Sequence, residues 1–372
     1  MKTKRNSIAI FVVVLGAIML VIGCPSEPEK AEAVSFGTAV NATDNKKRLL
    51  NYLADEYGRR IISGQMDTSW TTNTGNSGMD MIARVYADTG KYPAIKGFDF
   101  IQLPWDNGAE QTTEAIAWWE GKNNGNVLVQ GKHGIVAFCW HWKIGPWMEF
   151  YTERTSFRIP YRNGALDTSS EEFTLIKNDL DKVAVQLQKL EDRDIPVLWR
   201  PLHEASGGWF WWGASGPEAY KALWRYIYDY LANTKGLDNL IWVWNGQDAA
   251  WFPGGDTVDI AGYDVYPGPK NYGSQSDKFG ETLLMVPGKD RIVALTENGA
   301  IPDPDRCLED NAMWSWFMTW NDNSGSTQGQ TNENNFWTGE YHNTGAHKNK
   351  VYHHDLVITL DELPDISGYR KN

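Results

Sequence analysis

The chain has few cysteines and an excess of acidic over basic side chains. Only three of its 372 residues are cysteines, which excludes a disulfide framework and a zinc cluster built from thiolates. There are 35 basic and 47 acidic residues, so the formal net charge is −12. A nucleic-acid-binding protein needs a basic face to neutralise phosphates, and this charge therefore argues against nucleic acid as a partner.

Aromatic residues, in contrast, are abundant. The chain contains 19 Trp, 16 Tyr and 13 Phe within a composition that is 42% hydrophobic and 22% charged, as expected for a globular protein with a sizeable core. An indole ring is a flat apolar surface with one polar edge. The faces of sugar rings carry C–H groups that suit such surfaces, so this composition favours carbohydrate as a ligand.

The first residues have the pattern of an export signal. A short basic segment precedes 15 uncharged residues, 8–22, a run too short to cross a membrane comfortably. The sequence Val21-Ile22-Gly23-Cys24 resembles a bacterial lipobox, in which the cysteine becomes the lipidated first residue. We expect a signal peptide over 1–23, then a lipidated Cys24 and a flexible tether over 24–40. The alternative is an ordinary signal peptide in which Cys24 has no role.

This interpretation implies an exported protein that a lipid holds at the bacterial cell envelope, on the periplasmic face or at the cell surface. The lipid would be its only membrane contact. In an oxidising compartment Cys139 and Cys307 could pair, although two buried free thiols explain them equally well. Nothing indicates an obligate partner, so we expect a monomer.

Eight short apolar runs alternate with longer segments of helical periodicity. The runs are 61–65, 93–100, 134–142, 196–204, 240–245, 259–266, 291–298 and 313–320. The clearest helix covers Phe173 to Leu190, where apolar residues recur every three or four positions. Further helices are expected at 49–57 behind a Thr43 cap, at 80–87, at 113–119 and from Pro217 to Leu231. This alternation is typical of an α/β fold, the (β/α)8 TIM barrel, and predicts one catalytic domain over 41–372.

Three connections depart from a regular barrel. Residues 246–258 and 299–312 are too short for full helices. Residues 321–350 are polar and rich in Asn, Gly and Thr, which predicts a long loop after the last strand. Such a loop would lie on the face where barrel active sites are built.

Two glutamates end predicted strands: Glu204 the fourth and Glu297 the seventh. Side chains at these strand ends point into the mouth of a barrel, so the pair can flank one glycosidic bond. Hydrolysis of that bond needs one acid to protonate the departing oxygen and one carboxylate to attack or support the anomeric carbon. This chemistry requires neither metal nor other cofactor. Two solvated loop acids are the alternative, and that alternative fits either glutamate alone better than it fits both.

Arg200 shares strand parity with Glu204, so both side chains are expected to face the barrel axis. A buried guanidinium must be paired, because an unpaired buried charge is very costly. Glu297 is the natural partner, and this pairing would keep Glu297 ionised. A purely structural ion pair lower in the barrel is the alternative for Arg200.

Several segments resemble the β-mannanases of glycoside hydrolase family 26. They are Trp199-Arg200-Pro201-Leu202-His203-Glu204, Gly208-Trp209-Phe210-Trp211-Trp212-Gly213, Tyr263-Asp264-Val265-Tyr266 and Leu295-Thr296-Glu297-Asn298-Gly299. The resemblance extends over roughly residues 45–365, and His203 is its most distinctive position. It implies a retaining endo-β-1,4-mannanase that hydrolyses mannan, glucomannan or galactomannan by double displacement.

The resemblance also implies individual roles, with Glu204 as general acid/base and Glu297 as nucleophile. Tyr266 would hydrogen-bond Glu297. The remaining substrate contacts would come from His141 and His203 beside the sugar at the cleaved bond, Trp209 on the leaving-group side, Trp320 beneath that sugar, and Trp147 or Trp142 in the cleft wall.

Family resemblance is weak evidence for a substrate, because loop changes retune a cleft. The same chemistry on a mixed-linkage glucan or a β-1,3-xylan therefore stays open, as does exo-acting release of mannobiose. A non-catalytic glycan-binding lipoprotein would need the tryptophans but neither glutamate.

Overall fold

The structure is a computed structural model, and it describes most of the chain beyond residue 40. The described residues are 41–68, 79–106, 108–128, 133–145, 148–287, 291–322 and 331–370. The expected signal peptide, Cys24 and the tether lie outside these residues, and so does Trp147. Within the described part, no helix combines the length and the apolar character needed to span a membrane.

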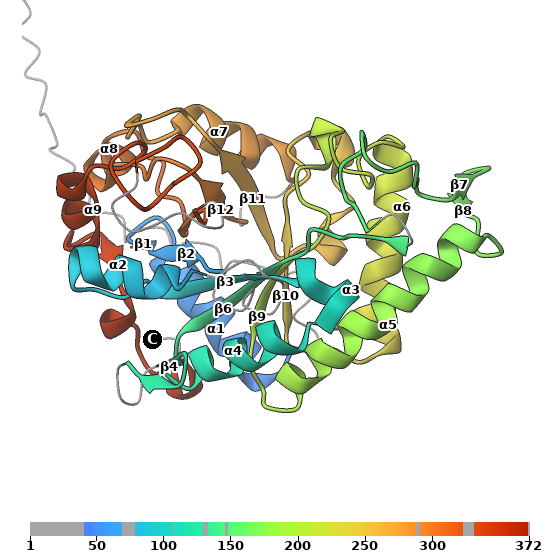
Figure 1. The fold of residues 1–372 in the computed structure, drawn as a ribbon, viewed down its shortest axis with the longest axis horizontal. Coiled ribbons are helices and arrows are strands. Elements are labelled where there is room, and N and C mark those ends of the chain that lie inside the picture. The colour runs from blue at the N-terminus through green and yellow to red at the C-terminus, as the bar shows by residue number, and fades with distance from the viewer. Residues whose placement is uncertain are drawn as a thin grey trace, which may run out of the picture. The chain divides into compact units, whose positions relative to one another are not determined.

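Eight parallel strands close into a barrel, with the helices arranged around them (Figure 1). In chain order the strands are β2 (Gly64–Met66), β3 (Ile95–Asp99), β6 (Ile135–Cys139), β9 (Val197–Arg200), β10 (Leu240–Trp244), β11 (Ile260–Val265), β12 (Ile292–Asn298) and β13 (Phe317–Thr319). Each predicted run supplies one of these strands, so the predicted (β/α)8 barrel is confirmed.

The fourth barrel strand is shorter than its apolar run. It ends at Arg200, and Leu202 and Glu204 then adopt positive φ angles of 53° and 52°. The parity argument is therefore wrong for Glu204, because the backbone leaves strand geometry before it reaches this residue. Glu204 is held by a turn after the strand and precedes a short 3-10 helix, Ala205–Gly207.

The first run divides at Ser63 instead of forming one strand. Its first half, β1 (Ile61–Ile62), pairs with β14 (Val357–Ile358) outside the barrel, and its second half is β2. Gly64 lets β2 approach its neighbour closely, since a Cβ there would lie 2.6 Å from the Phe317 carbonyl oxygen. Two small hairpins complete the strands: β4 (Lys122–Asn123) with β5 (Asn126–Val127), and β7 (Tyr161–Arg162) with β8 (Ala165–Leu166).

The described residues form nine α-helices. They are α1 (Asp44–Glu56), α2 (Met81–Thr89), α3 (Leu103–Asp106), α4 (Ala109–Trp119), α5 (Glu171–Glu191), α6 (Pro217–Tyr228), α7 (Ser276–Met285), α8 (Pro304–Glu309) and α9 (Gly345–Tyr352). The Thr43 side chain caps α1 by accepting from the Lys46 backbone N–H, as predicted. The expected helix after Pro217 is also present, and its end is a π-helical turn, Asp229–Thr234.

The irregular connections largely follow the expectation. The connection 246–258 contains only two 3-10 turns, and 299–312 contains only the six-residue helix α8. The predicted loop 321–350 is wrong at its end, because α9 begins at Gly345. The Thr344 side chain accepts from the His347 backbone N–H and so starts this helix.

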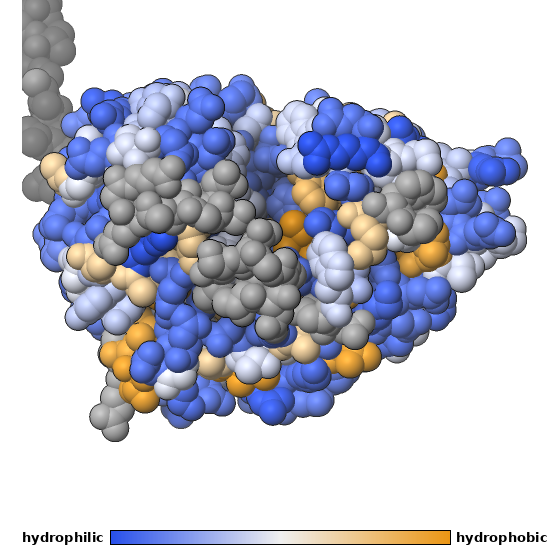
Figure 2. All heavy atoms as spheres, in the orientation of Figure 1, coloured by the Kyte–Doolittle hydropathy of each residue, from blue (hydrophilic) through white to orange (hydrophobic). Residues whose placement is uncertain are grey.

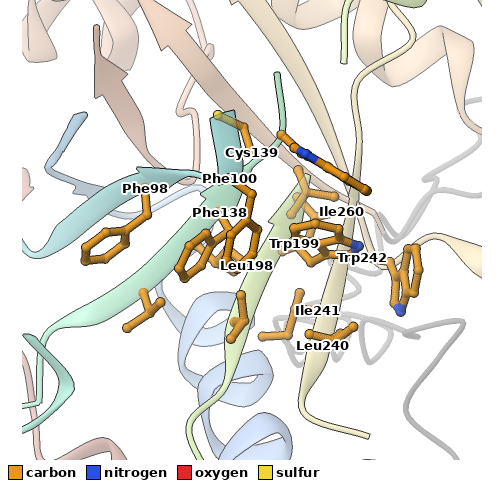
Figure 3. Close-up of a cluster of buried hydrophobic side chains, with 14 of the residues drawn as sticks. Phe98, Phe100, Phe138, Cys139, Leu198, Trp199, Leu240, Ile241, Trp242 and Ile260 are labelled. Carbon is orange, nitrogen blue, oxygen red and sulfur yellow. The ribbon is translucent and has the colours of Figure 1, made fainter. Parts of the chain in front are cut away.

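Most tryptophans belong to the core, which lies inside the barrel and between the barrel and its helices. Thirteen of the 17 described tryptophans are buried. Figure 3 shows Phe98, Phe138, Trp199 and Trp242 on neighbouring strands, and the Phe98 and Phe138 rings stack with centroids 5.1 Å apart. Burying one such side chain contributes about 2–3 kcal/mol, so this layer holds the strands and the mouth in place. Figure 2 shows mainly hydrophilic residues outside, with small separate hydrophobic patches.

Candidate active site

Three carboxylates meet at the mouth of the barrel. Asp264 lies on β11, Glu297 on β12, and Glu204 in the turn after β9. One oxygen of each carboxylate lies within 4.8 Å of an oxygen of both others. The structure therefore brings together the two glutamates that sequence position singled out, and it adds an aspartate to them.

Arg200 binds two of these carboxylates. Its Nη1 donates to Asp264 Oδ2 at 2.9 Å, and its Nη2 donates to Glu297 Oε1 in a short contact. All three side chains are more than nine-tenths buried. The second Asp264 oxygen accepts from Asn245 Nδ2 and from Thr296 Oγ1, both at 2.7 Å. The expected Arg200–Glu297 contact is present, within a larger network that satisfies the buried charges.

Glu297 is held at both oxygens. Tyr266 donates its hydroxyl to Oε2 at 2.7 Å, the contact that the family resemblance implies, while Arg200 holds Oε1. Burial raises the pKa of Glu297 and the charge of Asp264 raises it further, although Arg200 and His141 act in the opposite direction. Fixed in this way, the carboxylate has one orientation in the mouth.

Glu204 lies nearer the open edge of the site. Its Oε2 accepts from Trp209 Nε1 at 2.9 Å, and the Trp209 ring is 45% exposed. Burial raises the pKa of Glu204, and the charges of Asp264 and Glu297 add to this shift, which exceeds the shift of Glu297. As the pH rises, Glu297 therefore ionises first and Glu204 keeps the proton of the pair.

Two histidines form the next wall of the mouth, with their Nε2 atoms 3.3 Å apart. His141 Nδ1 lies 2.6 Å from Asp99 Oδ2, and the His141 backbone N–H donates to Asp99 Oδ1. Burial lowers the pKa of His141, but the Asp99 carboxylate outweighs burial and leaves it raised. Burial, with the charges of Arg200 and His141, lowers the pKa of His203 well below its ordinary value. The proton of the histidine pair therefore stays on His141.

Some of the aromatic residues expected to contact the substrate lie at the mouth, and others lie in the core. Trp320 follows β13, is partly exposed, and has its ring 5.7 Å from that of His141. Trp209 also borders the mouth through its bond to Glu204. Trp142 is a wrong candidate, because it is fully buried and stacks on Trp140 with ring centroids 3.9 Å apart. The expectation for Trp147 lies outside the described residues.

Two groups of side chains have the spacing of metal ligands. In the first, Glu204, Asp264 and Glu297, the guanidinium of Arg200 already occupies the position of a cation. In the second, Asp99 and His141 bond each other, and burial raises the pKa of the third member, the Cys139 thiol, well above its ordinary value. A protonated thiol is a poor ligand, so neither donor set favours a metal.

The two cysteines that the structure describes are free and buried. Cys139 ends β6 beneath the mouth, whereas Cys307 lies on α8. The sequence left a disulfide and two buried free thiols equally open, and the structure contains the two free thiols.

The sequence reasoning missed Asp264 and Asp99, although signals for both were present. Asp264 shares strand parity with Tyr266. Asp99 is the last residue of β3, a position similar to that of Glu297, which is the last but one residue of β12. The rule applied to the glutamates, an acid at the end of a barrel strand, covers both aspartates as well. An aspartate near a strand end is also a common turn residue, and only the contacts separate these two interpretations.

At the mouth of the barrel, one carboxyl group keeps its proton and lies close to a second that an arginine favours in the ionised form. This is the arrangement of a retaining glycoside hydrolase. Retaining glycoside hydrolases keep their two carboxyl groups about 5–5.5 Å apart, in agreement with the proximity of Glu204 and Glu297. The chain belongs to glycosyl hydrolase family 26, whose sequence model matches residues 38–362.

Three relatives illustrate this membership. The mannan endo-1,4-β-mannosidase of Thermothelomyces thermophilus is 35% identical over 351 residues, which are 91% of this chain and 66% of that protein. A GH26-CBM35 β-(1,4)-mannanase of Podospora anserina has a TM-score of 0.75 at 35% identity, over 92% of this chain and 72% of that one. A β-mannanase from a protist symbiont of the termite Reticulitermes speratus, complexed with gluco-manno-oligosaccharide, has a TM-score of 0.72 at 30% identity, over 89% and 98%. The chain spans only 49% to 66% of three curated relatives that it matches.

Proposed function

We propose that the protein is a retaining endo-β-1,4-mannanase that hydrolyses mannan, glucomannan or galactomannan. The observation that carries the proposal is the pairing of Glu204 and Glu297 in one mouth, with the proton held by Glu204. The substrate class is supported by the relatives, which are named as mannan endo-1,4-β-mannosidases or β-mannanases.

In the proposed mechanism, Glu204 protonates the departing glycosidic oxygen while Glu297 attacks the anomeric carbon. Arg200 and Tyr266 orient the attacking carboxylate. Once the glycosyl-enzyme bond forms, the charge on Glu297 is gone and the pKa of Glu204 falls. Glu204 then acts as the base that takes a proton from the water that hydrolyses the intermediate.

His141 and His203 are the residues that we propose determine the specificity for the sugar beside the cleaved bond. The 2-hydroxyl of mannose is axial, so a mannan enzyme must fit a ring whose shape differs from that of glucose. The two rings meet edge to face with centroids 4.6 Å apart, and His203, which precedes Glu204 in the chain, is buried. We expect His203→Asn to lower the ratio of mannan to glucan hydrolysis; an unchanged ratio would contradict this assignment.

The catalytic assignment is tested by Glu204→Gln and Glu297→Ala, with the exposed Glu218→Gln on α6 as the matched control. Both site variants should lose release of reducing sugar from galactomannan, while the control keeps it. Proton NMR of the first product should show a retained β-anomer. Parent-like hydrolysis by either variant, or an inverted anomer, would overturn the mechanism.

The same assays separate the alternatives. Mixed products from mannohexaose support endo action, whereas release of mannobiose alone supports an exo mode. Preferred hydrolysis of a mixed-linkage glucan or a β-1,3-xylan would replace mannan as substrate. Binding of mannan without any cleavage would support a glycan-capture protein.

The export interpretation is also part of the proposal. The lipobox-like sequence Val21–Cys24 supports removal of residues 1–23 and lipid attachment at Cys24, which would tether the protein to the bacterial cell envelope. The protein is proposed to act there as a monomer.

A further inference from the structure

Tyr266 holds Glu297 with a side chain that is itself nearly half exposed. Its hydroxyl donates to Glu297 Oε2, yet the residue is 45% exposed. Within the described ranges, the ring of Phe336 is the only aromatic ring in contact with it, and the two centroids lie 5.3 Å apart. A hydrogen bond fixes a carboxylate only if the donor is held in place by its own neighbours. The support of the Tyr266 ring therefore depends on Phe336.

Phe336 approaches Tyr266 from a different part of the chain. Tyr266 directly follows β11, whereas Phe336 belongs to the connection between β13 and α9. In the barrel, β12 lies between β11 and β13, so the two rings meet across the end of the strand that carries Glu297. Gly299 makes room for them, since a Cβ there would lie 3.1 Å from the Phe336 ring and 3.4 Å from the Tyr266 ring.

Asn343 fastens the Phe336 backbone to the segment that follows Glu297. Its Nδ2 donates to the carbonyl oxygens of Phe336 and Gly299, both at 2.9 Å. Its Oδ1 accepts from the Ile301 backbone N–H, also at 2.9 Å, and the side chain is buried. This one amide therefore fixes the loop of Phe336 relative to the strand of the nucleophile.

Asp322 fastens the same loop immediately after Phe336. Its buried carboxylate accepts from the backbone N–H of Trp337 at 2.8 Å and from that of Thr338 at 3.0 Å. Arg84 on α2 donates to Asp322 Oδ2 at 3.1 Å and so connects the loop with a helix of the barrel wall. Bonds to a buried charge are among the stronger hydrogen bonds, so this part of the loop is firmly held.

His342 supports Phe336 from a further side. The two rings pack with centroids 4.6 Å apart. The His342 carbonyl oxygen accepts from the Lys270 backbone N–H at 2.9 Å, and Lys270 belongs to the connection that begins with Tyr266. The loop is therefore bonded both to the segment after Glu297 and to the segment after Tyr266.

We propose that Phe336 is a positioning residue for the nucleophile, which it holds in place through Tyr266. The inference rests on the proposed function. The packed ring keeps the Tyr266 hydroxyl on Glu297 Oε2, and this bond keeps the carboxylate aimed at the anomeric carbon. Without Phe336, the tyrosine ring gains freedom to turn, and the carboxylate loses one of its two fixed donors, Arg200 being the other.

A double-mutant cycle tests this role with the parent, Phe336→Ala, Tyr266→Phe and the variant that carries both changes. Phe336→Leu, which keeps most of the apolar bulk, is the conservative replacement. The matched control is Phe279→Ala on α7, since Phe279 is also partly exposed and packs on another ring, that of Trp314, at 5.1 Å. For each protein, kcat, KM and the pH profile are measured on one soluble mannan.

Tyr266→Phe should lower kcat about 10- to 100-fold, because it removes a hydrogen bond to a charged group. Phe336→Ala should lower kcat about tenfold with KM within about twofold of the parent, and Phe336→Leu should recover most of that loss. The double variant should be no slower than Tyr266→Phe alone, since Phe336 acts on the reaction only through Tyr266. Phe279→Ala should keep the parent kcat.

Two further measurements separate positioning from a general loosening of the fold. A donor to the ionised form lowers the pKa of a carboxyl group, so Tyr266→Phe and Phe336→Ala should each raise the pKa of Glu297 and move the acidic limb to higher pH. A dinitrophenyl β-mannobioside needs the nucleophile but not the acid, because its leaving group departs without a proton. Its kcat/KM should therefore fall in Phe336→Ala as on mannan, and stay near the parent value in Glu204→Gln.

Additive losses in the double variant, an acidic limb that does not move, or parent-like activity of Phe336→Ala on either substrate would overturn the role of Phe336 while the parent remains active. A parent that cleaves no β-glycan would instead overturn the proposed function, so the two failures are distinguishable. Matched circular dichroism spectra exclude misfolding as the cause of a loss. If Phe336→Ala does not fold, Phe336→Leu replaces it in the cycle, where its smaller loss should also vanish beside Tyr266→Phe.

Discussion

At the scale of single residues, the site is a problem of charge balance. One guanidinium, Arg200, binds two buried carboxylates, Asp264 and Glu297, and a third carboxyl group lies beside them. If all three carboxyl groups were ionised, three negative charges would face the single positive charge of Arg200, which leaves a net charge of about −2 in a buried space. The arrangement therefore favours a proton on Glu204, the member that lacks a bond to the arginine.

A bell-shaped pH dependence of kcat/KM is the first prediction. Activity needs Glu297 ionised and Glu204 protonated, so it should fall below the pKa of Glu297 and above that of Glu204. Both pKa values are raised, mainly by burial, so both limbs should lie above the range of free glutamate. A profile that is maximal near pH 4 would contradict this.

Asp264→Asn should move both limbs to lower pH. The charge of Asp264 raises the pKa of Glu204 and of Glu297, and asparagine keeps its size without the charge. The parent and the variant are compared by their pH–rate profiles on one soluble mannan. Unmoved limbs with a uniformly lower rate would mean that Asp264 has only a structural role.

Asp99→Asn should move the acidic limb in the opposite direction, to higher pH. Asp99 holds the proton on His141, and the positive charge of His141 acts to lower the pKa of Glu297. Losing that charge makes Glu297 harder to ionise. Histidine NMR titration should show a lower pKa for His141 in the variant. The two aspartate variants control each other, since equal shifts in both would contradict the assignment.

At the scale of elements, local sequence determines where helices begin. The Ser170 side chain accepts from the Phe173 backbone N–H and starts α5, and the apolar face from Phe173 to Leu190 is buried against the barrel. This periodicity lies within one segment, so the sequence alone predicted the helix. Strand ends were predicted less well, because the apolar run 196–204 continues past the point where β9 stops pairing.

Ser170→Ala should lower the free energy of unfolding by about 1 kcal/mol, the usual cost of losing a helix cap. Activity of the folded enzyme should not change, because the bonds of Ser170 are to Asp167, Phe173 and Thr174, none of which belongs to the site. Chemical denaturation measures the difference. Its control is Ser169→Ala, since Ser169 is exposed, bonds Asp167, and should have an effect within about 0.5 kcal/mol when replaced. Equal losses in both variants would refute the cap as the cause.

At the scale of the whole molecule, the catalytic barrel and the proposed anchor are separate features of one chain. The barrel is recognisable within residues 38–362, whereas the lipobox-like Cys24 precedes that match. Anchoring and catalysis are therefore expected to be independent.

Cys24→Ala should release the protein from the membrane fraction without changing kcat/KM on soluble mannan. The lipid is the only proposed membrane contact, so its removal should suffice. Fractionation of expressing bacteria, followed by assay of each fraction, measures both effects. A variant that has lost residues 1–23, as mass spectrometry can show, and still stays with the membrane would contradict the anchor.

The sequence by itself determined the order of eight strands, the main helices, and the positions of Glu204 and Glu297 after strands four and seven. These features depend on periodicity within short segments and on the general geometry of barrels. Tertiary structure alone decided that Asp264 shares Arg200 with Glu297, that Asp99 keeps the proton on His141, and that Trp142 is core while Trp105 is exposed. The reason is physical: charge pairing and burial depend on neighbours from other strands, and no local pattern records which neighbours those will be.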